Sequence, residues 1–108
     1  MKFKKDKYRK SRGNYSRLLN LYCRVCHKNI MSYQKDGAGN LRRVYLDRIF
    51  LPKILTNLQN KPLNKIRRLI CSNCKEELGT PYIYKKENRK AYKIYQDSLI
   101  KKVGKLKN

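Results

Sequence analysis

Four cysteines, arranged as two CxxC pairs, are the residues of this chain whose type and spacing could perform chemistry. Cys23 and Cys26 form the first pair, Cys71 and Cys74 form the second, and the sequence contains no other cysteine. Two residues between the sulfurs let both thiolates of a pair reach one ion from a tight turn. Because four thiolates complete the tetrahedral shell of a structural zinc ion, we predict a structural Zn²⁺ cofactor held by all four cysteines.

Two other uses of the cysteines compete with zinc. A pair of disulfides would need an oxidising compartment, and the basic start of the sequence lacks the apolar run of a secretory signal. Residues 23–27 also spell CxxCH, the attachment pattern of c-type haem, in which His27 would be an axial ligand. Haem loading needs the same missing signal and leaves Cys71 and Cys74 without a purpose. Zinc is therefore favoured, and His27 is expected beside the site, either solvated or touching a phosphate.

The charge balance of the 108 residues points to a polyanionic partner. Lys and Arg number 29 against 7 Asp and Glu, which gives a net charge of +22. A lone compact domain with so much uncompensated charge would repel itself. The sequence has no stretch of 18 apolar residues and no lipidation motif, so nucleic acid is favoured over a membrane.

Catalysis finds little support in the residue types that are present. The chain has a single histidine and seven scattered acids, whereas a metal-dependent phosphodiesterase needs clustered carboxylates or histidines. Residues 37–39 contain two glycines, and with flanking Lys35, Arg42 and Arg43 they would allow a phosphate backbone to approach closely. The P-loop spacing is missing, so no nucleotide-binding role is assigned. We predict that the chain is not an enzyme and has no small-molecule substrate.

Basic residues with interleaved tyrosines are the candidate RNA contacts, because cations meet phosphates and aromatic rings stack on exposed bases. They lie in the first 17 residues, after the Asp-Gly turn, before the second cysteine pair and near the C-terminus. The predicted RNA-binding residues are Lys2, Lys4, Lys5, Lys7, Tyr8, Arg9, Lys10, Arg12, Tyr15, Arg17, Arg42, Arg43, Lys65, Arg67, Arg68, Lys85, Lys86, Arg89, Lys90 and Lys93.

The cysteine pairs must be positioned by hairpins. Residues 18–22 are apolar and predict a strand into the first pair, residues 30–33 predict its return strand, and residues 80–84 predict the strand after the second pair. Between the pairs, the apolar spacing of residues 41–49 predicts a helix, although Val and Tyr leave a strand open, and residues 53–60 predict a short helix. Asn88 is expected to cap a last helix over 89–102.

These elements predict a small α+β fold: a zinc ribbon with two CxxC knuckles on β-hairpins, a helical insertion and a C-terminal helix. Residues 1–17 are expected to form a basic extended arm, residues 18–103 a single zinc-stabilised domain, and residues 104–108 a frayed tail. The arm has no hydrophobic period, so it should be disordered alone. A metal is an expected aid to folding, since so short a chain buries limited apolar surface.

Two CxxC knuckles in a small, highly basic chain resemble the zinc-ribbon proteins of the ribosome. The resemblance covers the four cysteines and the overall charge, and the interval 27–70 is longer than in compact ribosomal ribbons. It implies a fold nucleated on zinc, tails threaded among ribosomal RNA helices, neighbouring ribosomal proteins as partners, and no catalysis. We therefore expect a non-enzymatic RNA-binding protein of the cytoplasmic, or an organellar, ribosome. A DNA-binding transcription or replication accessory protein is the alternative.

Overall fold

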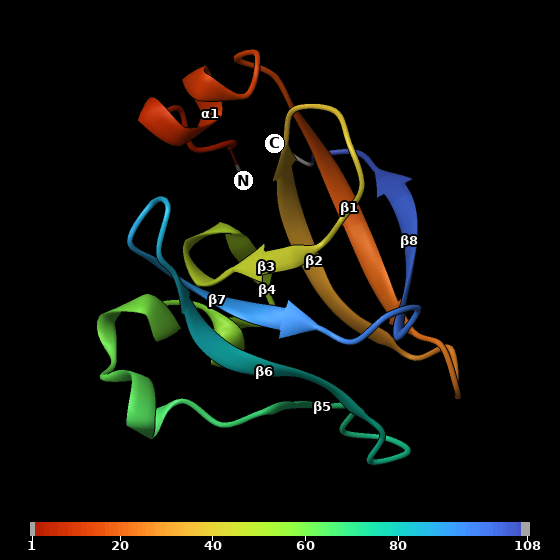
Figure 1. Cartoon of the computed structure of the whole chain (residues 1–108). Helices are drawn as coiled ribbons and strands as arrows, with labels where there is room; N and C mark the ends of the chain where they lie inside the picture. The colour runs from red at the N-terminus through yellow and green to blue at the C-terminus, as the bar shows by residue number, and fades with distance from the viewer. Residues whose placement is uncertain (1, 107–108) are drawn as a thin grey trace.

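Eight strands in two antiparallel sheets form the framework of the protein (Figure 1), in a computed structural model that describes residues 2–106. The strands are β1 (Ser16–Cys23), β2 (Asn29–Asp36), β3 (Arg43–Tyr45), β4 (Ile49–Leu51), β5 (Leu69–Ile70), β6 (Glu77–Tyr84), β7 (Arg89–Ile94) and β8 (Leu99–Gly104). The first sheet has the order β4-β2-β1-β8 and the second has the order β3-β7-β6-β5. The fold is therefore mostly β, not the expected α+β mixture.

The hairpin β1–β2 is the centre of the first sheet and confirms the strand predicted over 18–22 and its return. Its register pairs Leu19 with Tyr33 and Leu21 with Met31. All four side chains are buried, because alternate residues of a strand point to the same face. Strand β8 pairs with the other edge of β1, so the last strand closes against the first.

The second sheet is built on the hairpin β6–β7, and it shares one hydrophobic core with the first. Val44, Leu78 and Tyr92 from this sheet join the buried residues of β1 and β2 in a single cluster. Cys23 and Cys71 belong to the same cluster and are fully buried. The cysteine pairs therefore lie where the two sheets meet.

The helix predicted over 89–102 is wrong, because this segment forms β7, a turn and β8. Asn88 does not cap a helix; its φ of 51° places it in the left-handed region, in the turn between β6 and β7. Asn adopts this conformation more readily than most residues. Asp97, with a φ of 59°, has the same conformation in the next turn. Polar turn residues and a tyrosine-rich composition thus decide the segment against the helical spacing.

The prediction of a helical insertion between the cysteine pairs is also wrong. Val44 and Tyr45 pair with β7, and the apolar spacing of 41–49 comes from the short 3₁₀ turn η1 (Leu46–Arg48), which rotates the chain between β3 and β4. The short helix expected over 53–60 is replaced by two single 3₁₀ turns. These two turns are η2 (Lys53–Leu55) and η3 (Leu58–Asn60), and a further 3₁₀ turn, η4 (Leu63–Lys65), follows them.

The N-terminal segment differs from the expected extended arm, because it packs on the body of the protein. Asp6 caps helix α1 (Lys7–Ser11), and one carboxylate oxygen accepts the N–H groups of Tyr8 and Arg9 at 3.1 Å each. The buried Gln34 side chain binds the backbone of Lys4, accepting its N–H at 2.7 Å and donating to its carbonyl at 2.9 Å. The Cα radius of gyration of 13.2 Å matches the roughly 13 Å of a compact chain of this length.

The two chain ends complete the description. Of the tail expected to fray over 104–108, Gly104 belongs to β8, while residues 107–108 lie outside the described residues. Among residues 2–106, no helix has the length and apolar character needed to cross a membrane.

Candidate functional site

The four cysteines lie together at one side of the molecule, where the turns of β1–β2 and β5–β6 meet (Figure 1). Cys23 is the last residue of β1, and Cys71 directly follows β5. All four Sγ atoms lie within 4.8 Å of one another, with 3.6 Å from Cys23 to Cys74 and 3.5 Å from Cys26 to Cys71. Because one hairpin belongs to each sheet, a metal held here would join the two sheets.

The sulfur geometry fits a tetrahedral metal site. A Zn–S bond of about 2.3 Å implies an S···S edge of roughly 3.8 Å in a regular tetrahedron. The two short S···S distances, 3.5 and 3.6 Å, are close to this edge. They are far above the roughly 2.05 Å of a disulfide, and all four cysteines are free. The cluster can therefore hold a metal ion with thiolate ligands.

The two knuckles repeat one backbone arrangement although they share only their cysteines in sequence. In the first, the carbonyl of Cys23 accepts the N–H of His27 at 2.8 Å; in the second, the carbonyl of Cys71 accepts the N–H of Lys75 at 2.9 Å. His27 and Lys75 have φ angles of 63° and 67°, both in the left-handed region. His27 therefore occupies a turn position that follows each CxxC pair, and it is not part of the four-residue ligand group.

The pKa values of the thiols show why the site favours a cation. Hydrogen bonds from the Asn73 side chain and from the backbone of Lys28 lower the pKa of Cys26 to about 6. The backbone N–H of Glu76 favours the Cys74 thiolate, but burial and the three neighbouring thiols together raise the pKa of Cys74 to about 12. Four thiolates this close repel one another, and a bound metal ion compensates their charge.

Almost all acidic side chains form ion pairs with arginines of the same chain. Six of the seven acids make such pairs: Asp6, Asp36, Asp47, Glu76, Glu77 and Glu87. Their partners are Arg12, Arg24, Arg48, Arg68 and Arg89. Within residues 2–106, no lysine pairs with a carboxylate. The lysine charge is therefore uncompensated.

Arg48 is the centre of a buried ion-pair cluster that fixes the N-terminal segment. Its side chain is 1% exposed and binds Asp36 at 3.0 Å and Asp6 at 2.6 Å. Burial acts to raise the pKa of Asp6, but the hydrogen bonds from Arg48 and from the backbone of Arg9 prevail and lower it to about 2. The scarce acids thus hold elements together instead of reducing the surface charge.

Arg89, predicted as an RNA contact, has a structural position instead. Its guanidinium lies between the rings of Tyr8 and Tyr45, 4.1 and 3.7 Å from their centroids, and it binds Asp47 at 2.8 Å. Its side chain is only 4% exposed, so a phosphate cannot reach it, and we remove Arg89 from the candidate contacts. Arg12 is partly committed as well, with an ion pair of 2.6 Å to Glu87.

The remaining predicted RNA-binding residues spread over the surface, and the fold does not gather them into one patch. The exposed ones are Lys2, Lys4, Lys5, Lys7, Lys10, Tyr15, Arg42, Lys65, Arg67, Arg68, Lys85, Lys86 and Lys93. The half-buried ones are Tyr8, Arg9, Arg12, Arg17, Arg43 and Lys90. Three of these cations bind backbone carbonyls: Lys4 that of Asp47, Arg12 that of Tyr8, and Lys90 those of Gln59 and Lys61.

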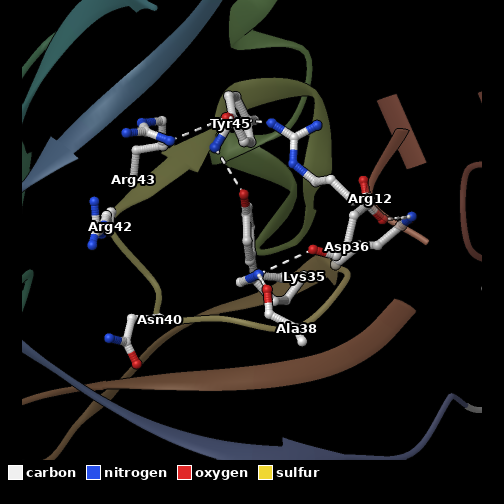
Figure 2. A pocket seen from close by; sticks show the side chains of 10 residues that line it. Arg12, Lys35, Asp36, Ala38, Asn40, Arg42, Arg43 and Tyr45 are labelled. Atoms are coloured by element: carbon white, nitrogen blue, oxygen red, sulfur yellow. Dashed lines mark hydrogen bonds between the residues drawn. The ribbon is translucent and has the colours of Figure 1, made fainter. Parts of the chain in front are cut away.

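One hollow beside the β2–β3 loop does bring predicted residues together (Figure 2). Arg12, Arg42 and Arg43 line a cavity of about 190 Å³ with Tyr33 and Tyr45. The glycine loop and its flanking cations are the sequence signal for this place. The contribution of Arg12 and the two tyrosine hydroxyls depends on tertiary packing, which the sequence pattern does not contain.

Comparison of the chain with protein-family models, with curated proteins and with solved structures finds no match in any of the three. Function is therefore inferred from the chain's own chemistry. Its two relevant features are the four-thiol cluster and the distribution of charge.

Proposed function

We propose that the chain is a non-enzymatic RNA-binding protein with a structural Zn²⁺ ion, and that it works as a component or close associate of the ribosome. The observation that carries this proposal is the use of the acids. Six of seven are paired with arginine, and the lysines of residues 2–106 have no carboxylate partner. A protein with a net charge of +22 arranged in this way needs an external polyanion to neutralise it.

Zinc is the metal that we assign to the four cysteines. Soft thiolate ligands select zinc over the hard cations, and four protein ligands with no open position are typical of a structural site. Cys23 and Cys26 would hold the ion from the first sheet, and Cys71 and Cys74 from the second. The paired knuckle hairpins support a zinc ribbon with a long insertion between the knuckles.

RNA is favoured over the DNA alternative by the kind of surface that is presented. In residues 2–106 the only α-helix is α1, with five residues, so no helix is long enough to read a major groove. Strands, loops and tyrosine side chains are exposed instead, and such surfaces suit the single-stranded and irregular regions of folded RNA. The spread of lysines over the surface fits a protein surrounded by RNA.

Sedimentation tests the ribosomal part of this proposal. Tagged protein expressed in cells would be run through a sucrose gradient with and without ribonuclease treatment of the lysate. We expect it to migrate with one ribosomal subunit and to move to the top after ribonuclease. Migration at the top without ribonuclease would contradict a ribosomal role, and recovery with DNA instead would favour the DNA-binding alternative.

A filter-binding titration against salt tests the RNA-binding part. Phosphate contacts release counterions, so log K should fall linearly with log salt concentration, with a slope of roughly −0.7 per contact for a single strand. Binding that does not change with salt would contradict the proposal.

A further inference from the structure

The hollow beside the β2–β3 loop is built mainly by one continuous segment. Nine of its ten lining residues lie between residues 33 and 45, and the tenth is Arg12 from the N-terminal segment. Figure 2 shows Arg42 and Arg43 on one side, the Tyr45 ring above, and Asn40 and Ala38 below. The volume of about 190 Å³ is below the roughly 300 Å³ at which pockets hold drug-sized ligands. It suits a small group such as a phosphate.

The acids near this hollow are already engaged. Asp36 lines it, but its two carboxylate oxygens accept hydrogen bonds from Ser16, Gln34 and Arg48. Glu87 neutralises Arg12. The charges of the other arginines of the hollow stay uncompensated.

Arg43 is oriented by neutral groups, which is the arrangement expected of an anion-binding arginine. Its Nε donates to the Tyr82 hydroxyl at 3.0 Å and its Nη1 to the Tyr45 hydroxyl at 3.4 Å, while its guanidinium lies 4.0 Å from the Tyr84 ring centroid. Among the described residues neither Arg43 nor the exposed Arg42 has a carboxylate partner. Both arginines therefore keep their charge and free donors for a ligand.

The loop adds further positive potential. Lys35 donates to the carbonyl oxygens of Asp36, Gly37 and Ala38 at 3.0, 3.4 and 3.3 Å, so its ammonium holds the loop in shape. Within residues 2–106, the backbone N–H groups of 38–41 donate no hydrogen bond to the protein. Burial, together with the charges of Arg17 and Arg12, lowers the pKa of Lys35, and a bound anion would relieve this repulsion.

A second, larger hollow is lined in part by the same loop. Its volume is about 690 Å³, and Asn40 and Arg42 line both hollows. Tyr95 and Lys101 line only the larger one, and Tyr95 is exposed. Its hydroxyl donates to Glu77 at 3.0 Å. Arg42 and Lys101 give this hollow two cations against the one carboxylate of Asp97, and an aromatic ring beside such cations is a usual platform for an unpaired base.

We infer that Arg42 and Arg43 bind one phosphate of a single-stranded RNA segment in the smaller hollow, and that the neighbouring nucleotide enters the larger one, where Tyr95 stacks on its base. This inference rests on the proposed RNA-binding function and names the part of the surface that contacts an extended strand. Arg42, which borders both hollows, contacts the backbone between the two positions.

Fluorescence anisotropy with a labelled oligouridine of about ten nucleotides tests this site. The double variant R42Q/R43Q is compared with K53Q/K61Q, which removes the same charge from two exposed lysines between β4 and β5 that line neither hollow and are not among the predicted RNA contacts. We expect about a tenfold or larger loss of affinity for R42Q/R43Q and less than about a threefold loss for K53Q/K61Q, since only the first pair contacts the strand in a built site. Metal content and circular dichroism confirm that both variants fold.

Tyr95 gives a second, independent measurement on the same oligonucleotide. Y95F keeps the ring and should bind within about twofold of wild type, whereas Y95A should bind about fivefold or more weakly. Equal losses of affinity in the arginine and the lysine double variants, or equal binding of Y95A and Y95F, would overturn the site while leaving the proposed function intact. If wild-type protein binds neither the oligonucleotide nor ribosomal RNA, the proposed function itself fails.

Discussion

At the scale of single residues, the backbone conformation after each CxxC pair explains the position of His27, whose role the sequence leaves open. His27 follows a pattern shared with haem attachment sites, but Lys75 takes the same left-handed conformation after the second pair. The position is therefore set by the turn and not by ligand chemistry. A left-handed residue with a side chain costs about 1–2 kcal/mol, a cost that glycine avoids.

His27→Gly is consequently expected to keep the metal and to leave the free energy of unfolding unchanged or raise it by up to about 1 kcal/mol, because lost strain is partly offset by the entropy of glycine. Metal analysis and urea unfolding of the metal-loaded protein would check this, with Lys75→Gly as the matched variant. Loss of the metal in H27G alone would show that the histidine is a ligand.

A buried arginine is the residue on which the N-terminal segment depends most. Replacing Arg48 by methionine leaves Asp36, whose side chain is 5% exposed, without its cation. Breaking a buried pair in this way costs about 3–5 kcal/mol, whereas an exposed pair contributes under about 1 kcal/mol. Urea unfolding should therefore show a large loss for R48M and a small one for R24M, whose pair with Glu76 is exposed. Similar losses in the two variants would contradict a central role for the cluster.

At the scale of elements, the sequence predicts the strands and turns that depend only on residues near them in the chain. The strands of the knuckle hairpins follow from short apolar runs beside the cysteines, and the four-thiol cluster follows from cysteine spacing. The segment 89–102 is different, because Tyr92, Tyr95 and Leu99 fit a helical period as well as they fit strands. Pairing of β7 with β3 and of β8 with β1 decides it, and these partners lie far away in the sequence.

The β2–β3 loop is a second element whose role depends on distant contacts. Gly37 has a φ of 71°, and a Cβ there would collide with the backbone of Arg12, whereas a Cβ on Gly39, with a φ of 105°, would meet no atom within 4 Å. Gly37→Ala should therefore destabilise the protein by about 2–4 kcal/mol, from strain plus a steric clash. Gly39→Ala carries the backbone strain alone. Equal losses of unfolding free energy in G37A and G39A would show that the N-terminal segment does not pack on the loop.

At the scale of the whole molecule, the acidic side chains and the thiol cluster join different parts of the fold. The acids are placed between elements, where they hold the N-terminal segment and the turns, so the outer surface stays strongly positive. This division could not be read from the sequence, because the partners of each acid are set by tertiary structure. Arg89 shows the consequence: a residue that composition assigns to the surface is enclosed by two tyrosines.

The metal is expected to decide whether the molecule folds at all. One cysteine pair belongs to each sheet, so losing a bound ion would remove one link between the sheets and leave four thiols at the shared core. Structural zinc contributes about 10–16 kcal/mol in zinc-finger peptides, and a small domain is stable by only about 5–15 kcal/mol. Chelation should therefore unfold the protein.

Elemental analysis and thermal unfolding check this expectation together. Purified protein should contain one zinc ion per chain, and a strong chelator should abolish the cooperative transition, which added Zn²⁺ restores. C71S should behave like the chelated wild type, whereas S72A, next to it in the knuckle and exposed, should unfold like the untreated protein. A cooperative transition that survives complete metal removal would show that the hydrophobic core alone joins the two sheets, and that the thiol cluster is not the element on which the fold depends.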